Sequence, residues 1–138
     1  MSDRPLAGAR ILVVEDEAVI AFDLTEALTD AGAAVVGPAT TLTAAFRHAT
    51  DGALSAALLD VRLRSKTVFP VAKVLLERAV PLAFHTGDPD ASTLARAWPG
   101  SEILTKPASR EVIVAALARL LAHRKGPAWA LRSTWPRP

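Results

Sequence analysis

One aspartate stands alone at the end of an apolar run in the middle of the chain. Residues 56–59 are Ala-Ala-Leu-Leu, and Asp60 follows them directly before a polar loop. Short apolar runs bounded by loops are typical of strands that are buried on both faces. In open α/β sheets, ligands bind outside the carboxyl ends of the strands. A carboxylate at this point is therefore a candidate for chemistry or ion binding rather than for packing.

Other polar residues stand at the ends of three further predicted strands. Glu15 and Asp16 follow the first strand, Thr86 follows the fourth and Lys106 follows the fifth. The carboxyl ends of parallel strands lie at the same edge of a sheet. We therefore expect these side chains to meet Asp60 at one edge.

Their chemistry is that of phosphoryl transfer. Three neighbouring carboxylates repel one another unless a cation intervenes, and oxygen ligands of this kind suit Mg²⁺, which also binds phosphate oxygens. Lys106 supplies a positive charge and Thr86 a hydroxyl donor, and both stabilise a phosphoryl group and its transition state. Asp60, the isolated carboxylate, is the predicted nucleophile.

The remaining sequence alternates short apolar runs with amphipathic stretches. The apolar runs predict strands over 10–15, 33–37, 55–60, 80–85 and 102–105. Stripes at helical spacing predict helices over 17–31, 41–50, 69–78, 91–98 and 110–123. Gly32 suits the left-handed position that ends a helix, and 61–68 is a predicted loop. Strand–helix alternation with short connections favours a parallel α/β sheet with right-handed crossovers.

Composition narrows the class of protein further. The chain has 138 residues, which fits one domain, and no cysteine, which excludes disulfides and thiolate zinc sites. Its start does not resemble a signal peptide, and no apolar run reaches the roughly 18 residues of a membrane span. We therefore expect a cytoplasmic protein with no membrane partner.

The basic charge belongs to the last residues. The formal net charge is +2, but residues 124–138 carry four basic residues and no acid, which leaves −2 for residues 1–123. A nucleic-acid partner is therefore not expected, because such binders carry a basic face on the folded part. We expect one domain over 1–123 and a poorly ordered, Pro- and Trp-containing tail over 124–138.

The site residues resemble the receiver domain of two-component response regulators. The resemblance implies a flavodoxin-like (βα)5 doubly wound parallel sheet with strand order 2-1-3-4-5. It also implies Mg²⁺-dependent transfer of a phosphoryl group from a kinase histidine to an aspartate. It covers residues 9–122 and is carried by an ordered set: Glu15-Asp16, Asp60, Thr86 and Lys106-Pro107.

The resemblance also implies a role for each residue of the metal site. Asp16 and Asp60 contact the metal directly, and Glu15 contacts it mainly through water. The backbone carbonyl of Arg62 adds a further ligand.

The two remaining members of the set handle the phosphoryl group. The resemblance implies that Thr86 turns toward it and that Lys106 pairs with it, with a cis peptide bond between Lys106 and Pro107. His85, beside Thr86, has a side chain that titrates near neutral pH, but we expect it to have a packing or surface role.

A narrower likeness concerns residues 68–72 and 80–87. They resemble the stand-alone alphaproteobacterial receivers with a Phe-Ala-Thr-Gly-x-Tyr signature, which lack an output domain. Asp88-Pro89 replaces the aromatic of that signature, and Ile103 and Leu104 occupy the strand that usually carries the switch aromatic. The coupling between hydroxyl and aromatic is therefore not expected in its usual form.

A basic cluster, Arg62, Arg64 and Lys66, lies in the loop after Asp60. The family often carries glycine and acid there, and asparagine is common at the position of Arg62. We hypothesise that the cluster favours the phosphorylated state or partly substitutes for the metal.

The sequence therefore predicts a single-domain response regulator that is phosphorylated on Asp60. Its partners would be a sensor histidine kinase or a histidine phosphotransfer protein, and a downstream protein unless it drains phosphoryl groups from a shared kinase. It is not expected to be an enzyme beyond catalysing its own phosphorylation and dephosphorylation.

Two alternatives stay open. The first is a pseudo-receiver interaction module that acts without phosphorylation, which the missing aromatics favour. The second is a Mg²⁺-dependent phosphohydrolase with an aspartyl intermediate. It is disfavoured because such enzymes usually carry an acid where this chain has Arg62.

Overall fold

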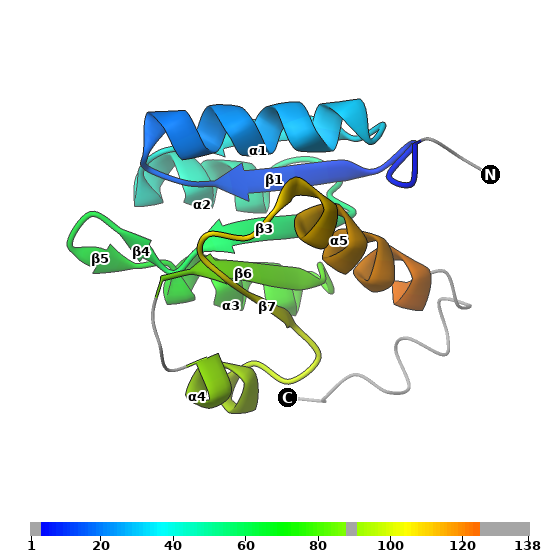
Figure 1. Cartoon of the computed structure of the whole chain (residues 1–138). Coiled ribbons are helices and arrows are strands. Elements are labelled where there is room, and N and C mark those ends of the chain that lie inside the picture. The colour runs from blue at the N-terminus through cyan, green and yellow to red at the C-terminus, as the bar shows by residue number, and fades with distance from the viewer. Residues whose placement is uncertain (1–3, 88–90, 125–138) are drawn as a thin grey trace.

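The structure is a computed structural model that describes residues 4–87 and 91–124. Its elements run along the chain as β1 (Arg10–Val14), α1 (Ala18–Asp30), β2 (Ala34–Ala39), α2 (Leu42–Thr50), β3 (Ala56–Asp60), β4 (Arg62–Leu63), β5 (Lys66–Thr67), α3 (Phe69–Glu77), β6 (Leu82–Thr86), α4 (Ala91–Ala97), β7 (Glu102–Thr105) and α5 (Arg110–Arg124) (Figure 1).

Five of the strands form one parallel sheet. Their order is β2-β1-β3-β6-β7, which corresponds to 2-1-3-4-5 when only these strands are counted. The predicted flavodoxin-like topology is therefore confirmed. Because all strands run in the same direction, their carboxyl ends share one edge.

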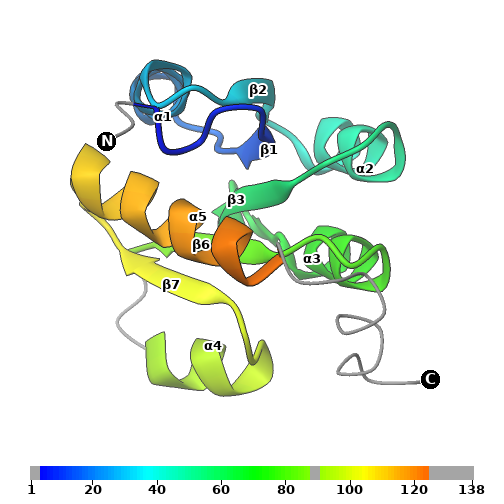
Figure 2. The ribbon, with the colours of Figure 1, turned by 90° about the vertical axis from the view of Figure 1, so that its right-hand side faces the viewer.

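Helices cover both faces of the sheet. Helices α1 and α5 lie on one face, and α2 and α3 lie on the other (Figure 2). The inner strands β1, β3 and β6 are buried on both sides, so consecutive residues enter different cores. Ile11 and Val13 of β1 pack with α1 and α5, while Leu12 and Val14 pack in the core of α2 and α3. This alternation determines which side chains lie on the same face of the sheet at the strand ends.

The segment 61–68 differs from the predicted loop. It contains a small hairpin in which β4 and β5 pair antiparallel, Arg62 with Thr67 and Leu63 with Lys66. Arg64 has a φ of 60°, the left-handed conformation that tight hairpin turns require. Leu63 is buried in the core of α2 and α3, which anchors the hairpin to the domain.

Several predictions concern residues that the structure does not describe. The predicted tail, residues 124–138, lies outside the described residues apart from Arg124, and so does Asp88-Pro89. In the described ranges, no helix has both the length and the apolar character needed to cross a membrane.

Candidate functional site

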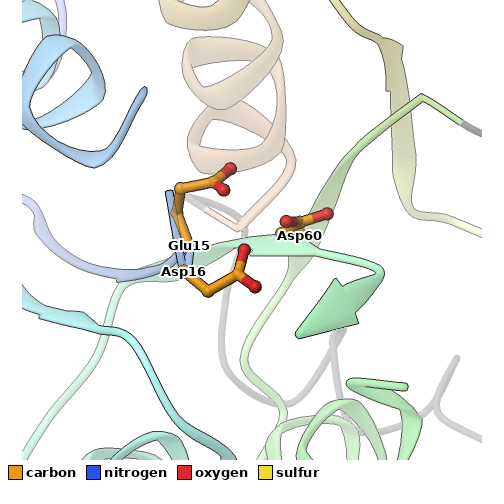
Figure 3. A group of neighbouring side chains, drawn as sticks. All are labelled: Glu15, Asp16 and Asp60. Atoms are coloured by element: carbon orange, nitrogen blue, oxygen red, sulfur yellow. The ribbon is translucent and has the colours of Figure 1, made fainter. Parts of the chain in front are cut away.

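Three carboxylates come together where β1 and β3 end. The two strands are neighbours, with Val14 opposite Leu59, so Glu15 and Asp60 occupy adjacent strand tips. Glu15, Asp16 and Asp60 each place one carboxylate oxygen within 4.8 Å of the other two (Figure 3). Glu15 and Asp60 are buried, and Asp16 is half-buried. The structure thus forms the acidic cluster that was expected from the strand ends.

Lys106 reaches the same cluster from the end of β7. Its Nζ lies 3.1 Å from Oε1 of Glu15 and 3.3 Å from Oδ2 of Asp60. Burial lowers the pKa of Lys106, but its contacts with Glu15 and Asp60 outweigh burial, and the net pKa is raised. The amine therefore stays charged between the two carboxylates.

The backbone around Lys106 is as the resemblance implied. The peptide bond to Pro107 is cis. The Lys106 backbone N–H donates a 2.7 Å hydrogen bond to the carbonyl of Thr86. This contact ties the end of β7 to the end of β6.

Asp60 has an unusual acidity in this environment. Burial raises its pKa, the neighbouring Glu15 carboxylate raises it further and Lys106 opposes both, giving a pKa of about 6. The first two effects disfavour the charged carboxylate more than one ammonium favours it. An additional cation at the cluster would lower this pKa and favour the ionised carboxylate.

The β4–β5 hairpin touches the acidic cluster through its backbone. The N–H of Arg64 donates a 2.8 Å hydrogen bond to Oδ2 of Asp16, and the N–H of Arg62 lies 3.4 Å from Oδ1 of Asp60. The side chains of Arg62, Arg64 and Lys66 are exposed. The basic cluster therefore lies at the margin of the site rather than inside it.

Thr86 and His85 end β6 beside Asp60. Thr86 is buried and pairs with Thr105 of β7. His85 stands directly opposite Asp60 in the β3–β6 ladder and is also buried. Of the two roles expected for His85, packing or surface, its burial fits packing, because an interior strand of the sheet is covered on both faces.

The donor set fits a magnesium ion. Mg²⁺ prefers oxygen ligands and binds through one or two carboxylates together with water and phosphate oxygens. Among residues 4–87 and 91–124, Glu15, Asp16 and Asp60 form the group of acids close enough to share an ion. A bound Mg²⁺ would neutralise negative charge on a phosphoryl oxygen at this edge.

Comparisons with known proteins give structural relatives. No family model matches the chain, and neither does any curated protein. A response regulator receiver protein from Sinorhizobium medicae is 27% identical with a TM-score of 0.77, over 87% of this chain and 99% of that one.

Two further matches are PhyR proteins. PhyR from Brucella abortus is 24% identical with a TM-score of 0.78, over 95% of this chain and 54% of that one. The receiver domain of Erythrobacter litoralis PhyR is 21% identical with a TM-score of 0.78, over 89% and 97% of the two chains.

The chain therefore has the fold of response regulator receiver domains, and the resemblance stated from its site residues is confirmed. The alphaproteobacterial stand-alone type is consistent with these neighbours. Receiver domains are generally signalling modules rather than enzymes, and the fold supports a role in two-component signalling.

Proposed function

We propose that the chain is a single-domain response regulator that accepts a phosphoryl group on Asp60. The donor is the phosphohistidine of a sensor histidine kinase or of a histidine phosphotransfer protein. An Asp60 carboxylate oxygen attacks phosphorus, the phosphorus–nitrogen bond breaks, and the donor imidazole leaves. The observation that carries the proposal is the Lys106 ammonium, 3.3 Å from Asp60 within a cluster of three carboxylates.

Each site residue has a defined task in this reaction. Lys106 binds an oxygen of the transferred phosphoryl group, and the Thr86 hydroxyl donates to another. Both contacts stabilise charge that grows in the transition state.

Glu15, Asp16 and Asp60, with the backbone carbonyl of Arg62, would hold Mg²⁺. The raised pKa of Asp60 supports this proposal, because a buried carboxylate that is hard to ionise needs a cation to act as a nucleophile.

Protein partners are proposed on the same basis. Helix α1 exposes Val19 by 83% and Phe22 by 66%, an apolar surface on the helix that follows Glu15 and Asp16 directly. Such a surface suits a docked kinase or phosphotransfer protein.

The output would be contact with a downstream protein, or drainage of phosphoryl groups from a shared kinase. The PhyR match from Bartonella quintana is itself described as an anti-anti-sigma factor. We propose no nucleic-acid or membrane partner.

One observation favours a second candidate, a pseudo-receiver that acts without phosphorylation. β7 carries Ile103 and Leu104 and no aromatic residue that could couple to Thr86. Phosphorylation of Asp60 would then lack the usual coupling through a hydroxyl and an aromatic side chain to the protein surface. Protein contact alone would carry the signal.

A phosphorylation assay separates the two candidates. The chain is incubated with acetyl phosphate and Mg²⁺ and analysed on a phosphate-affinity gel. We expect a retarded band that disappears with chelator and in Asp60→Asn. It should persist in Asp51→Asn, which alters an exposed aspartate at the end of α2. The pseudo-receiver would be favoured if the wild-type chain stays unmodified and its amide NMR spectrum does not change when beryllofluoride and Mg²⁺ are added.

A further inference from the structure

His85 is a buried polar residue that the proposed reaction does not use. It is 4% exposed and lies in register with Asp60 on one side and with Leu104 on the other. Residues in register on neighbouring strands project to the same face of a sheet. Lys106, two residues after Leu104, is on that face as well. The imidazole therefore belongs to the same layer as the Asp60–Lys106 pair.

Neither ring nitrogen of His85 has a hydrogen-bond partner among the described residues. Buried polar side chains are nearly always paired, and an unpaired one destabilises the fold. The neighbouring positions of this layer, Leu58, Ala83 and Leu104, are apolar. An aliphatic residue at position 85 would pack there without that penalty. Packing alone therefore does not explain why a histidine occupies position 85.

Its charged neighbours indicate the reason. In the β3–β6 ladder His85 stands opposite Asp60, whose carboxylate lies 3.3 Å from the Lys106 ammonium. A neutral imidazole keeps one nitrogen with a free lone pair, which accepts a hydrogen bond. Lys106 has three N–H donors, and its two ion pairs go to Glu15 and Asp60. One donor is left for a further acceptor on this face.

We propose that His85 is a positioning residue for Lys106, accepting a hydrogen bond from its ammonium when Lys106 turns from the Asp60 carboxylate to the phosphoryl group. Transfer to Asp60 converts the carboxylate to an acyl phosphate and moves the negative charge outward onto the phosphoryl oxygens, so Lys106 must rearrange. A fixed acceptor beside the lysine limits the orientations that the ammonium samples, which favours the reactive one. The inference rests on the proposed phosphorylation of Asp60.

The test compares two substitutions that separate hydrogen bonding from packing. His85→Leu keeps a similar volume and removes both nitrogens, whereas His85→Gln keeps an acceptor. With acetyl phosphate and Mg²⁺, we expect His85→Leu to be phosphorylated about tenfold more slowly and His85→Gln to regain most of that loss. His48→Leu, on α2 and outside the site, should match the wild type.

Thermal unfolding distinguishes positioning from a structural role. His85→Leu should have an unfolding midpoint equal to or above that of the wild type, because two unpaired nitrogens are removed. A slow reaction in an equally stable protein supports positioning. Loss of stability in parallel with the rate, with no rescue by His85→Gln, overturns it.

Nitrogen-15 NMR of the wild-type imidazole gives a readout that needs no variant. The acceptor nitrogen of His85 should shift when beryllofluoride and Mg²⁺ are added, and an unchanged resonance in a chain that binds beryllofluoride contradicts the inference. A wild-type chain that takes up phosphoryl as fast as His85→Leu refutes the inference and leaves the proposed function intact. A wild-type chain that takes up none refutes both.

Discussion

Asp60 has two neighbours of opposite charge, the carboxylate of Glu15 and the ammonium of Lys106. When all four groups are ionised, Asp60, Glu15 and Asp16 carry three negative charges against one positive charge on Lys106. The cluster therefore keeps a net charge of two negative units in a partly buried place. A divalent cation balances these two negative charges, which is the electrostatic reason for proposing Mg²⁺ here.

The acidity of Asp60 predicts how stability depends on pH without metal. Its pKa rises from 3.8 to about 6 on folding, so the folded chain binds the proton more tightly than the unfolded chain. The resulting stabilisation is fully present below about pH 4 and is lost as the pH rises through about 6. A shift of this size corresponds to about 3 kcal/mol. Urea unfolding in chelator between these pH values measures it.

Asp60→Asn gives the comparison for this prediction. The variant should be more stable than the wild type at pH 7 without metal, and its pH dependence should be flatter. Asp51→Asn, which changes an exposed aspartate, should follow the wild type. An Asp60→Asn profile that parallels the wild-type profile would contradict the raised pKa.

At the scale of single residues, some of the site could be predicted from sequence and some could not. The approach of Glu15, Asp60 and Lys106 follows from strand ends that share an edge. The hydrogen bond from the Arg64 backbone to Asp16 carries no signal in residue types, since any residue offers the same N–H. The unpaired nitrogens of His85 depend on what packs around the ring, which a single strand pattern does not specify.

Two helices end in the same backbone motif with different residues in its critical position. After α1, the N–H groups of Gly32 and Ala33 bond to the carbonyls of Thr29 and Leu28. After α3, the N–H groups of Ala79 and Val80 bond to Leu76 and Leu75 in the same crossed pattern. Both are Schellman motifs, which place one residue in the left-handed region. Gly32 has a φ of 103° and Ala79 a φ of 62°.

Ala79 therefore carries a conformational cost that glycine would not. Ala79→Gly should stabilise the chain by about 1 kcal/mol, because glycine has no Cβ to clash in this conformation. Urea unfolding at fixed pH measures the change. Ala115→Gly, at an exposed position inside α5, should destabilise by about 1 kcal/mol. Equal signs for the two substitutions would contradict the interpretation.

The main elements could be predicted because they are long enough to show a period. The helix stripes and the apolar strands locate the ten main elements, and observed bounds differ from the predicted ones by one or two residues at most ends. The β4–β5 hairpin could not be predicted. Its strands have two residues each and show no alternation, and its position depends on the hydrogen bond from Val68 to the carbonyl of Val61.

At the scale of the molecule, two apolar layers sandwich the sheet. One contains side chains of α2 and α3 and the other contains side chains of α1 and α5 (Figure 2). The buried apolar residues of both layers lie between Leu6 and Leu120 in the part of the chain that the structure describes. The described residues up to Leu120 thus form a buried core on each face of the sheet.

This arrangement predicts the effect of truncation. A chain that stops after Arg124 should keep the thermal midpoint of the full chain and its rate of phosphorylation by acetyl phosphate. The physical reason is that the described residues of both cores precede Arg124. Differential scanning calorimetry of the two chains measures the midpoint. A fall of several degrees after truncation would show that residues 125–138 contribute to the fold.

Identification of the modified side chain is the strictest test of phosphorylation on Asp60. The wild-type chain is phosphorylated with Mg²⁺ and a competent donor, and the site is located by peptide mass spectrometry under conditions that preserve acyl phosphates. We expect a single phosphoryl group on Asp60, absent in chelator. A chain that stays unmodified with Mg²⁺ and an active donor, or that carries the group on a histidine instead, would contradict it.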